Sequence, residues 1–171
     1  KDTIKISIFL NPIENFLKKT ETTLFLPQQL LKKRSMELIK KYFPNLDPDQ
    51  YRKYEQLYPL YQEWNEKINL ISRKDFQFLY ERHVLHSLAI AKTFNFPDNA
   101  VIMDAGTGGG FPGIPLAIYF PNVNFHLVDS TGKKIRAVEN IAKNLDLKNV
   151  RTEINRAELI NNKYDYVVSR A

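Results

Sequence analysis

The stretch that most constrains the fold is residues 101–115, where a short apolar run passes into glycines and then prolines. Residues 101–103 are Val, Ile and Met, as expected of a buried strand, and Asp104 follows them. Glycine permits positive φ and close approach of a ligand to the main chain, while proline is tolerated only in the first turn of a helix. The residues concerned are Gly106, Gly108, Gly110, Pro112 and Pro115. The stretch therefore predicts a strand, a glycine loop and a helix N-terminus.

The spacing Asp104-x-Gly106-x-Gly108-x-Gly110 indicates what this loop binds. It is similar to motif I of class I S-adenosylmethionine methyltransferases, in which a carboxylate attracts the ammonium group of the cofactor. The same carboxylate would repel a pyrophosphate. Two other interpretations stay open: the dinucleotide fingerprint Gly108-x-Gly110-x-x-Gly113, and a glycine-rich turn without a ligand.

A second acidic residue is placed to bind the same ligand. Residues 125–128 are predicted to form the next strand, and Asp129 ends it. A carboxylate at this point can accept hydrogen bonds from both ribose hydroxyls of a nucleoside. The alternative is that Asp129 caps the following helix.

After the glycine loop, strands and helices alternate. We expect a helix over residues 133–145 and further strands over 150–154 and 166–168. Such alternation is typical of a Rossmann-like, doubly wound parallel α/β sheet that binds ligands at the carboxyl ends of its strands. The strands should lie in the order third, second, first, fourth, which leaves the fourth strand as an unpaired edge.

The chain divides into three predicted regions. Residues 1–35 are a leader or extension of uncertain order, 36–95 an N-terminal helical region, and 96–171 the first half of a methyltransferase domain. The formal charge is +6, and residues 1–35 contribute seven Lys/Arg against three Asp/Glu. A strand is conceivable over residues 5–10, but we expect the leader to pack little against the rest.

The helical region carries a stripe of aromatic and aliphatic residues spaced three and four apart, which we assign to the core rather than to a base-stacking platform. Asp47 before Pro48 is predicted to cap one helix, and Asp75 the next. His83 lies on the apolar face of the second helix. We expect a core histidine with satisfied ring nitrogens, and a ligand-binding role is the alternative. The stripe is Tyr51, Tyr54, Leu57, Tyr58, Tyr61, Trp64 and Ile68.

Composition excludes several classes of protein. The chain has no cysteine and three scattered histidines, so it has no disulfide framework, no thiol zinc site and no metal cluster. No apolar run is long enough to span a membrane. We expect a cytoplasmic monomer that uses no metal and does not bind membranes.

From Met36 onward the sequence resembles the RsmG family (glucose-inhibited division protein B), the bacterial 16S rRNA (guanine-N7) methyltransferases. About 135 residues take part, and the Phe-Pro-Gly-Ile-Pro end of the glycine stretch is specific to this family. The matching stretches are Trp64-Asn65 with residues 67–70, Arg82-His83 with Ser87-Leu88, residues 104–115, residues 127–130 with 132–134, and residues 168–171.

The resemblance implies an S-adenosyl-L-methionine cofactor and 16S rRNA, or the small ribosomal subunit precursor, as partner. It places cofactor contacts at Gly106, Phe111, Ala157-Glu158 and Arg170, beside the residues Asp104, Gly108 and Asp129 singled out above. The chain departs from the family at His86, where an Asp is usual. The family's last third also has no counterpart, so we expect a domain truncated at its C-terminus.

Methylation at guanine N7 agrees with the absence of a catalytic triad, because N7 has an available lone pair and needs no general base. Catalysis then depends on orientation and on the field around a moving charge. The sequence accordingly assigns no catalytic residue. The alternatives are an NAD-binding Rossmann dehydrogenase, which Asp129 would also suit, and a non-catalytic nucleotide- or RNA-binding module.

Overall fold

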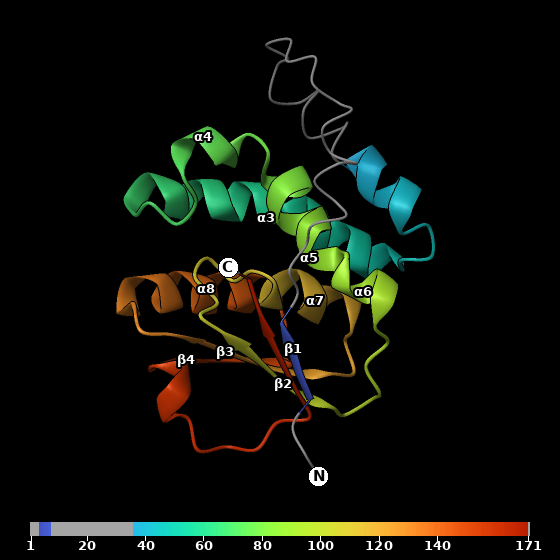
Figure 1. Cartoon of the computed structure of the whole chain (residues 1–171). Coiled ribbons are helices and arrows are strands. Elements are labelled where there is room, and N and C mark those ends of the chain that lie inside the picture. Colours follow the sequence, from blue (N-terminus) through green and yellow to red (C-terminus); the bar gives the residue numbers. More distant parts are fainter. Residues whose placement is uncertain (1–3, 8–35, 171) are drawn as a thin grey trace.

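The computed structural model describes residues 4–7 and 36–170, which form a parallel sheet below two layers of helices (Figure 1). The sheet has five strands in the order β1-β5-β2-β3-β4, and all neighbours are parallel. The strands are β1 (Ile4–Ser7), β2 (Val101–Ala105), β3 (Asn124–Asp129), β4 (Val150–Ile154) and β5 (Tyr166–Ser169).

The strand order confirms the predicted winding of β4, β3, β2 and β5, but two expectations about the sheet's edge are wrong. Ile4–Ser7 of the supposed leader pair with β5 in the register Ile4 to Tyr166 and Ser7 to Ser169. The leader thus contributes a strand to the main sheet, and β5 is not an unpaired edge. The free backbone groups of β5 are satisfied by a segment about 160 residues earlier in the chain. The remaining leader residues, 1–3 and 8–35, lie outside the described ranges.

The α-helices and the π-helix of the described residues lie on one side of the sheet. Figure 1 shows α7 and α8 against the strands, with the lead-in helices on top of them. Residues 36–42 form the first of these. The others are α3 (Pro48–Lys67), α4 (Arg73–Phe76), the π-helix η2 (Leu79–Leu85), α5 (His86–Leu88), α6 (Ile90–Thr93), α7 (Gly113–Tyr119) and α8 (Gly132–Asn144), and a 3₁₀ turn, η3 (Ala157–Leu159), follows β4.

The predicted helix starts are half right. Asp47 caps α3 in a capping box, since its side chain accepts from the Gln50 N–H and the Gln50 side chain accepts from the Asp47 N–H. Asp75 does not cap the next helix. Ser72 takes that position, because its hydroxyl accepts from the Asp75 N–H at 3.2 Å and donates to Asp75 Oδ2 at 2.6 Å.

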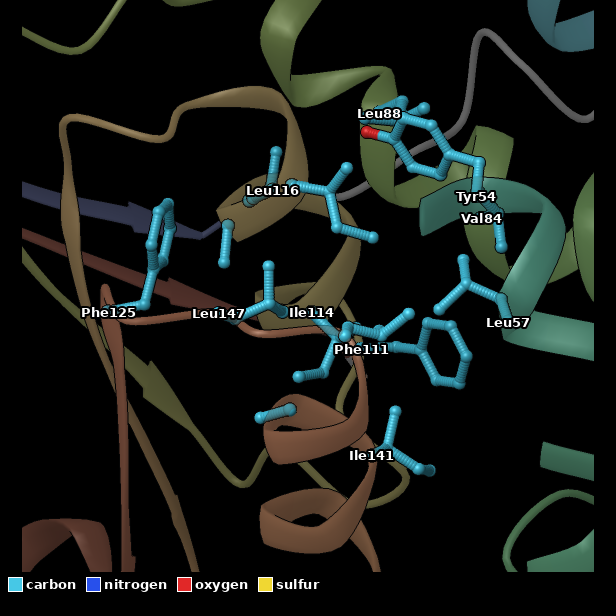
Figure 2. Close-up of a cluster of buried hydrophobic side chains, with 14 of the residues drawn as sticks. Tyr54, Leu57, Val84, Leu88, Phe111, Ile114, Leu116, Phe125, Ile141 and Leu147 are labelled. Atoms are coloured by element: carbon cyan, nitrogen blue, oxygen red, sulfur yellow. The ribbon is translucent and has the colours of Figure 1, made fainter. Parts of the chain in front are cut away.

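One hydrophobic core joins the lead-in helices to the sheet. Figure 2 shows side chains of α3, η2, α5, α7 and α8 meeting over β3, with Phe111 of the glycine loop among them. The stripe on α3 is part of this core: Tyr54, Leu57 and Tyr61 are fully buried. The stripe is therefore packing, as predicted, and not a stacking platform.

A smaller cluster, built on Met103, Val128 and Tyr164, covers the other face of the sheet. The segment between β4 and β5 supplies Tyr164 and runs below the strands in Figure 1. Among the described residues, no helix has the length and apolarity needed to cross a membrane.

Candidate functional site at the carboxyl ends of the strands

The loop between β2 and α7 has the conformation that its glycines permit. Gly106, Gly108 and Gly110 have φ of 70°, 57° and 90°, in the left-handed region that favours glycine. A Cβ at Gly106 would meet no heavy atom within 4 Å, whereas one at Gly110 would lie 2.8 Å from Ile114 Cγ1. The loop thus packs tightly at its far end and leaves its first glycine open.

Asp104 holds this loop from below. Its carboxylate is fully buried in β2, and Oδ2 accepts from Thr107 Oγ1 at 2.6 Å and from the Gly113 N–H at 2.8 Å. Oδ1 has no hydrogen-bond partner among the described residues. Burial raises the pKa of the Asp104 carboxyl to about 6, and the bonds from Thr107 and Gly113 oppose that rise. One oxygen thus organises the loop, and the other makes no hydrogen bond within the described residues.

Asp129 links the next strand to the loop. Its Oδ2 accepts from the Gly108 N–H at 2.9 Å, and its Oδ1 accepts from the Thr131 N–H at 2.8 Å. The N-cap of α8 is Thr131, so the alternative that Asp129 caps this helix is wrong. A carboxylate oxygen has two lone pairs, so each can still accept a ligand hydroxyl.

Phe111 and Arg170 meet on the inner side of the loop. The Phe111 ring is 2% exposed and stacks on Tyr61 with centroids 5.0 Å apart. The Arg170 guanidinium carbon, one residue beyond β5, lies 5.2 Å from the Phe111 centroid. Burial lowers the pKa of Arg170, and the nearby Asp104 carboxylate opposes this. The Phe111 side chain is therefore mostly core, with a cation over its face.

Ala157 and Glu158 lie in η3, at the end of the strand beside β3. Ala157 packs against the smaller cluster, and Glu158 is exposed, with Arg156 Nη1 at 3.8 Å from its Oε1. The Asn155 N–H donates to the Asp129 carbonyl at 3.2 Å, which ties this turn to the end of β3. The predicted residues thus lie at the carboxyl ends of β2, β3, β4 and β5. Asp104 and Asp129 are the two that hydrogen-bond directly to the glycine loop.

Three further residues shape the site in ways that were not predicted. Thr107 donates to Asp104, and the Tyr61 hydroxyl donates to the Gly109 carbonyl at 2.7 Å from 48 residues away. The Gly113 position lets α7 approach β3, since a Cβ there would lie 2.7 Å from Leu127 Cγ. Thr107 could have been found as the only hydroxyl within the glycine loop, whereas nothing local indicates the Tyr61 contact.

His83 lies beside this site with unsatisfied ring nitrogens. Its ring centroid is 5.1 Å from that of Phe111. Both ring nitrogens are buried, and neither has a hydrogen-bond partner among the residues that the structure describes. The expectation of a satisfied core histidine is therefore wrong. Burial lowers the pKa of His83 to about 4, and the positive Arg170 acts in the same direction.

Within the described ranges, no group of three or more His, Asp or Glu side chains could hold a metal ion. The polar groups of the site are instead one buried carboxylate, one half-exposed carboxylate, one guanidinium, one imidazole and the loop amides.

Comparison with known proteins places the chain among methyltransferases. The GidB family model, described as rRNA small subunit methyltransferase G, matches residues 50–171. The ribosomal RNA small subunit methyltransferase G of Cytophaga hutchinsonii is 56% identical over 136 residues, which are 80% of this chain and 66% of that protein. The protein of the same name from Phocaeicola vulgatus is 61% identical over 136 residues, 80% of this chain and 65% of its own length. The chain thus spans slightly less than two thirds of these relatives.

A solved structure shares the fold. Coclaurine N-methyltransferase, bound to N-methylheliamine and SAH, superposes with a TM-score of 0.52 at 15% identity, covering 92% of this chain and 53% of that one. At this identity the likeness concerns the fold alone, and it confirms the predicted class I Rossmann-like architecture.

Proposed function

Since this chain belongs to the GidB family, described as rRNA small subunit methyltransferase G, we propose that it binds S-adenosylmethionine and takes part in methylating N7 of a guanine in 16S ribosomal RNA. The observation that carries the proposal concerns buried Asp104, under a loop whose first glycine is open. Its Oδ1 has no hydrogen-bond partner in the part of the chain that the structure describes. A buried carboxylate oxygen without a partner is costly unless a ligand donor completes it.

The site residues fit this cofactor. The open space at Gly106 allows a ligand to approach the loop main chain, and Asp104 Oδ1 suits the ammonium of its methionine end. Arg170 supplies a cation for the carboxylate of the same end, and Asp129 keeps lone pairs for ribose hydroxyls. Ala157 and Glu158 follow the strand beside Asp129, where the adenine edge is expected.

When bound, S-adenosylmethionine supplies an electrophilic methyl group that a guanine N7 can attack with its own lone pair. The chain's residues then have to orient two ligands and exclude water, and none has to remove a proton. Arg170 and Asp104 provide opposite charges at one end of the site, which orients a zwitterionic group.

NAD remains the competing ligand because Asp129 would serve its ribose equally well. The two cofactors differ at the glycine loop, where NAD brings a pyrophosphate and S-adenosylmethionine an ammonium group. Asp104 is a buried carboxylate directly below that loop, so it favours the cation. A non-catalytic nucleotide-binding module would require the same cofactor contacts but no RNA.

We propose 16S rRNA, free or in an assembling small subunit, as the partner of a cytoplasmic monomer. A net positive charge favours attraction to a polyanion, but four of the six net charges come from residues 1–35. The support for this partner is therefore the family to which the chain belongs, and not its net charge.

The test is calorimetric titration of the protein with S-adenosylhomocysteine and with NAD. We expect binding of the first only, and loss of at least tenfold in affinity in Gly106→Val, because the new side chain occupies the open space and strains a residue at φ 70°. Transfer of labelled methyl from S-adenosylmethionine to 16S rRNA tests the reaction itself.

Asn99→Val is the matched control, since Asn99 also has a positive φ, 64°, but lies in the turn before β2. It should lower thermal stability as Gly106→Val does and leave affinity for S-adenosylhomocysteine within twofold. Equal binding of this ligand by wild type and Gly106→Val, or preference for NAD, contradicts the proposal.

A further inference from the structure

The segment that faces the glycine loop has an uncommon backbone. Residues Leu79–Leu85 form a π-helix, η2, between α4 and α5. π-Helical turns are rare because they lose regular i to i−4 hydrogen bonds, and they are found disproportionately at functional sites. An unfavourable local conformation often serves a function. In this π-helix, the side chain that lies against Phe111 of the glycine loop is His83.

His126, which is buried, shows how a histidine with a structural role is bonded in this chain. His126 in β3 has Tyr164 Oη at 2.5 Å and Arg151 Nη2 at 3.0 Å from its Nδ1, and Glu153 Oε2 at 3.1 Å from its Nε2. Both of its nitrogens are satisfied. His83 has no such partner within the described part of the chain, although an unpaired buried polar atom costs about 1–3 kcal/mol. The contrast indicates that the His83 nitrogens are kept for a ligand.

The charges of the site indicate which ligand. Asp104 and Arg170 offer an anion and a cation, which match the two charged ends of the cofactor's amino acid group. His83 is neutral, since burial and Arg170 lower its pKa; Arg82 and His86 act in the same direction and Asp75 opposes them. A neutral imidazole carries one donor and one acceptor, as does the edge of a nucleobase.

Neutrality also suits the reaction. Methylation of N7 moves the positive charge of the sulfonium group onto the purine, and a second cation beside Arg170 would oppose that movement. A neutral His83 can hold the base without this penalty.

We propose that His83 is a base-binding residue, which holds the target guanine by hydrogen bonds from its ring nitrogens while the loop, Asp104 and Arg170 hold the cofactor. This inference rests on the proposed function and adds the substrate side of the same site. In this proposal, η2 positions the His83 ring beside the Phe111 ring, at the edge of the cofactor site.

The test uses the 171-residue protein and two probes, guanosine 5′-monophosphate and S-adenosylhomocysteine. Histidine ring resonances are recorded by NMR during each titration, with His83 assigned from its variant. We expect the nucleotide to shift the His83 signals and adenosine 5′-monophosphate to shift them far less. In His83→Phe, affinity for the guanine nucleotide should fall at least tenfold, and affinity for S-adenosylhomocysteine should stay within twofold. His83→Asn, which keeps a donor and an acceptor, should recover part of the loss.

Tyr80→Phe is the matched control, because it removes a buried hydrogen bond from the same π-helix, between Tyr80 Oη and the Tyr54 carbonyl at 2.8 Å. It should leave both affinities unchanged, whereas equal effects of Tyr80→Phe and His83→Phe would show that His83 only supports the helix. No guanine binding by the wild type, equal binding by His83→Phe, or His83 shifts with S-adenosylhomocysteine alone would each overturn the inference. Failure of the wild type to bind S-adenosylhomocysteine counts against the proposed function instead, and the nucleotide titration is scored independently of it.

Discussion

Asp104 combines the organisation of the loop with an energetic cost. Its Oδ2 fixes Thr107 and Gly113, yet the carboxylate is fully buried and Oδ1 is unpaired among the described residues. A buried anion of this kind destabilises the free protein and is compensated when a cationic ligand group arrives. The residue thus fixes the loop at a cost in stability.

The first prediction concerns Asp104→Asn. The folded pKa of Asp104 is about 6 against an ordinary 3.8, so its contribution to stability is fully present below pH 4 and is lost as pH rises through 6. Two pKa units correspond to about 3 kcal/mol. Relative to wild type, Asp104→Asn should therefore gain up to about 3 kcal/mol in unfolding free energy between pH 4 and pH 7. Urea unfolding at several pH values measures this, and S-adenosylhomocysteine affinity should fall at least tenfold. A pH-independent difference between the two proteins would contradict it.

The second prediction concerns His83, whose pKa is lowered by folding, whereas that of Asp104 is raised. Its folded pKa of about 4 lies below the ordinary 6.5, so the stability it contributes is present above pH 6.5 and is lost as pH falls through 4. In His83→Phe this loss on acidification disappears, so the variant should gain stability over wild type from pH 6.5 down to pH 4. The same unfolding series checks it: the unfolding free energy of His83→Phe minus that of wild type should rise from pH 6.5 to pH 4. A difference that stays constant or falls would contradict the lowered pKa of His83.

At the scale of elements, α3 is the support of the ligand loop. Its side chains reach main-chain carbonyls on the loop and on α7: Tyr61 to Gly109 at 2.7 Å, Tyr54 to Pro115 at 2.9 Å, and Gln50 to Ile118 at 2.9 Å. A helix remote in sequence thereby fixes the conformation of the glycine loop. Loop precision depends on these three bonds as well as on the glycines.

The third prediction tests this support with Tyr61→Phe. Removing the hydroxyl leaves the buried Gly109 carbonyl without that partner, which should cost about 1–3 kcal/mol in unfolding free energy. Because the loop loses its anchor, affinity for S-adenosylhomocysteine should also fall, by about threefold to tenfold for a loss of about 1 kcal/mol in preorganisation. Tyr80→Phe should match the loss of stability without the loss of affinity. If the two variants bind the ligand equally well, the anchor does not control the loop.

At the scale of the whole molecule, residues 4–7 add an outer strand to one edge of the sheet. β1 pairs with β5, and β5 leads directly to Arg170. The expectation that residues 1–35 pack little against the rest is therefore wrong for these four residues.

The fourth prediction is that deletion of residues 1–7 lowers the thermal midpoint by about 2–8 °C, equivalent to about 1–2 kcal/mol. The deletion exposes the backbone of β5, so light scattering should also show increased aggregation. Affinity for S-adenosylhomocysteine should decrease, because Arg170 follows the strand that frays. Replacing residues 1–7 by a Gly/Ser sequence of the same length is the control for chain length and should behave as the deletion does. An unchanged midpoint in both variants would show that pairing of β1 does not stabilise the sheet.

What the sequence by itself determined was the local order of elements. Apolar runs, glycines and prolines act within a few residues, so the strand, loop and helix of residues 101–119 and the winding of β4, β3, β2 and β5 followed from pattern and handedness. The placement of Asp104 and Asp129 at strand ends followed in the same way. The cap of α4 did not, since Ser72 and Asp75 both suit an N-cap and only the backbone geometry selects Ser72.

What only the tertiary structure decided depends on contacts between distant segments. Four features follow only from how the helices and the sheet pack. They are the Tyr61 bond to Gly109, the packing of Phe111 into the core, the pairing of β1 with β5, and the His83 ring nitrogens without a partner among the described residues. Hydrophobic periodicity states which face of an element is buried, but not which polar atom on another element it meets. The sequence therefore predicted the glycine loop. The contacts of α3 with that loop, the pairing of β1 with β5 and the position of the His83 ring depend on tertiary packing.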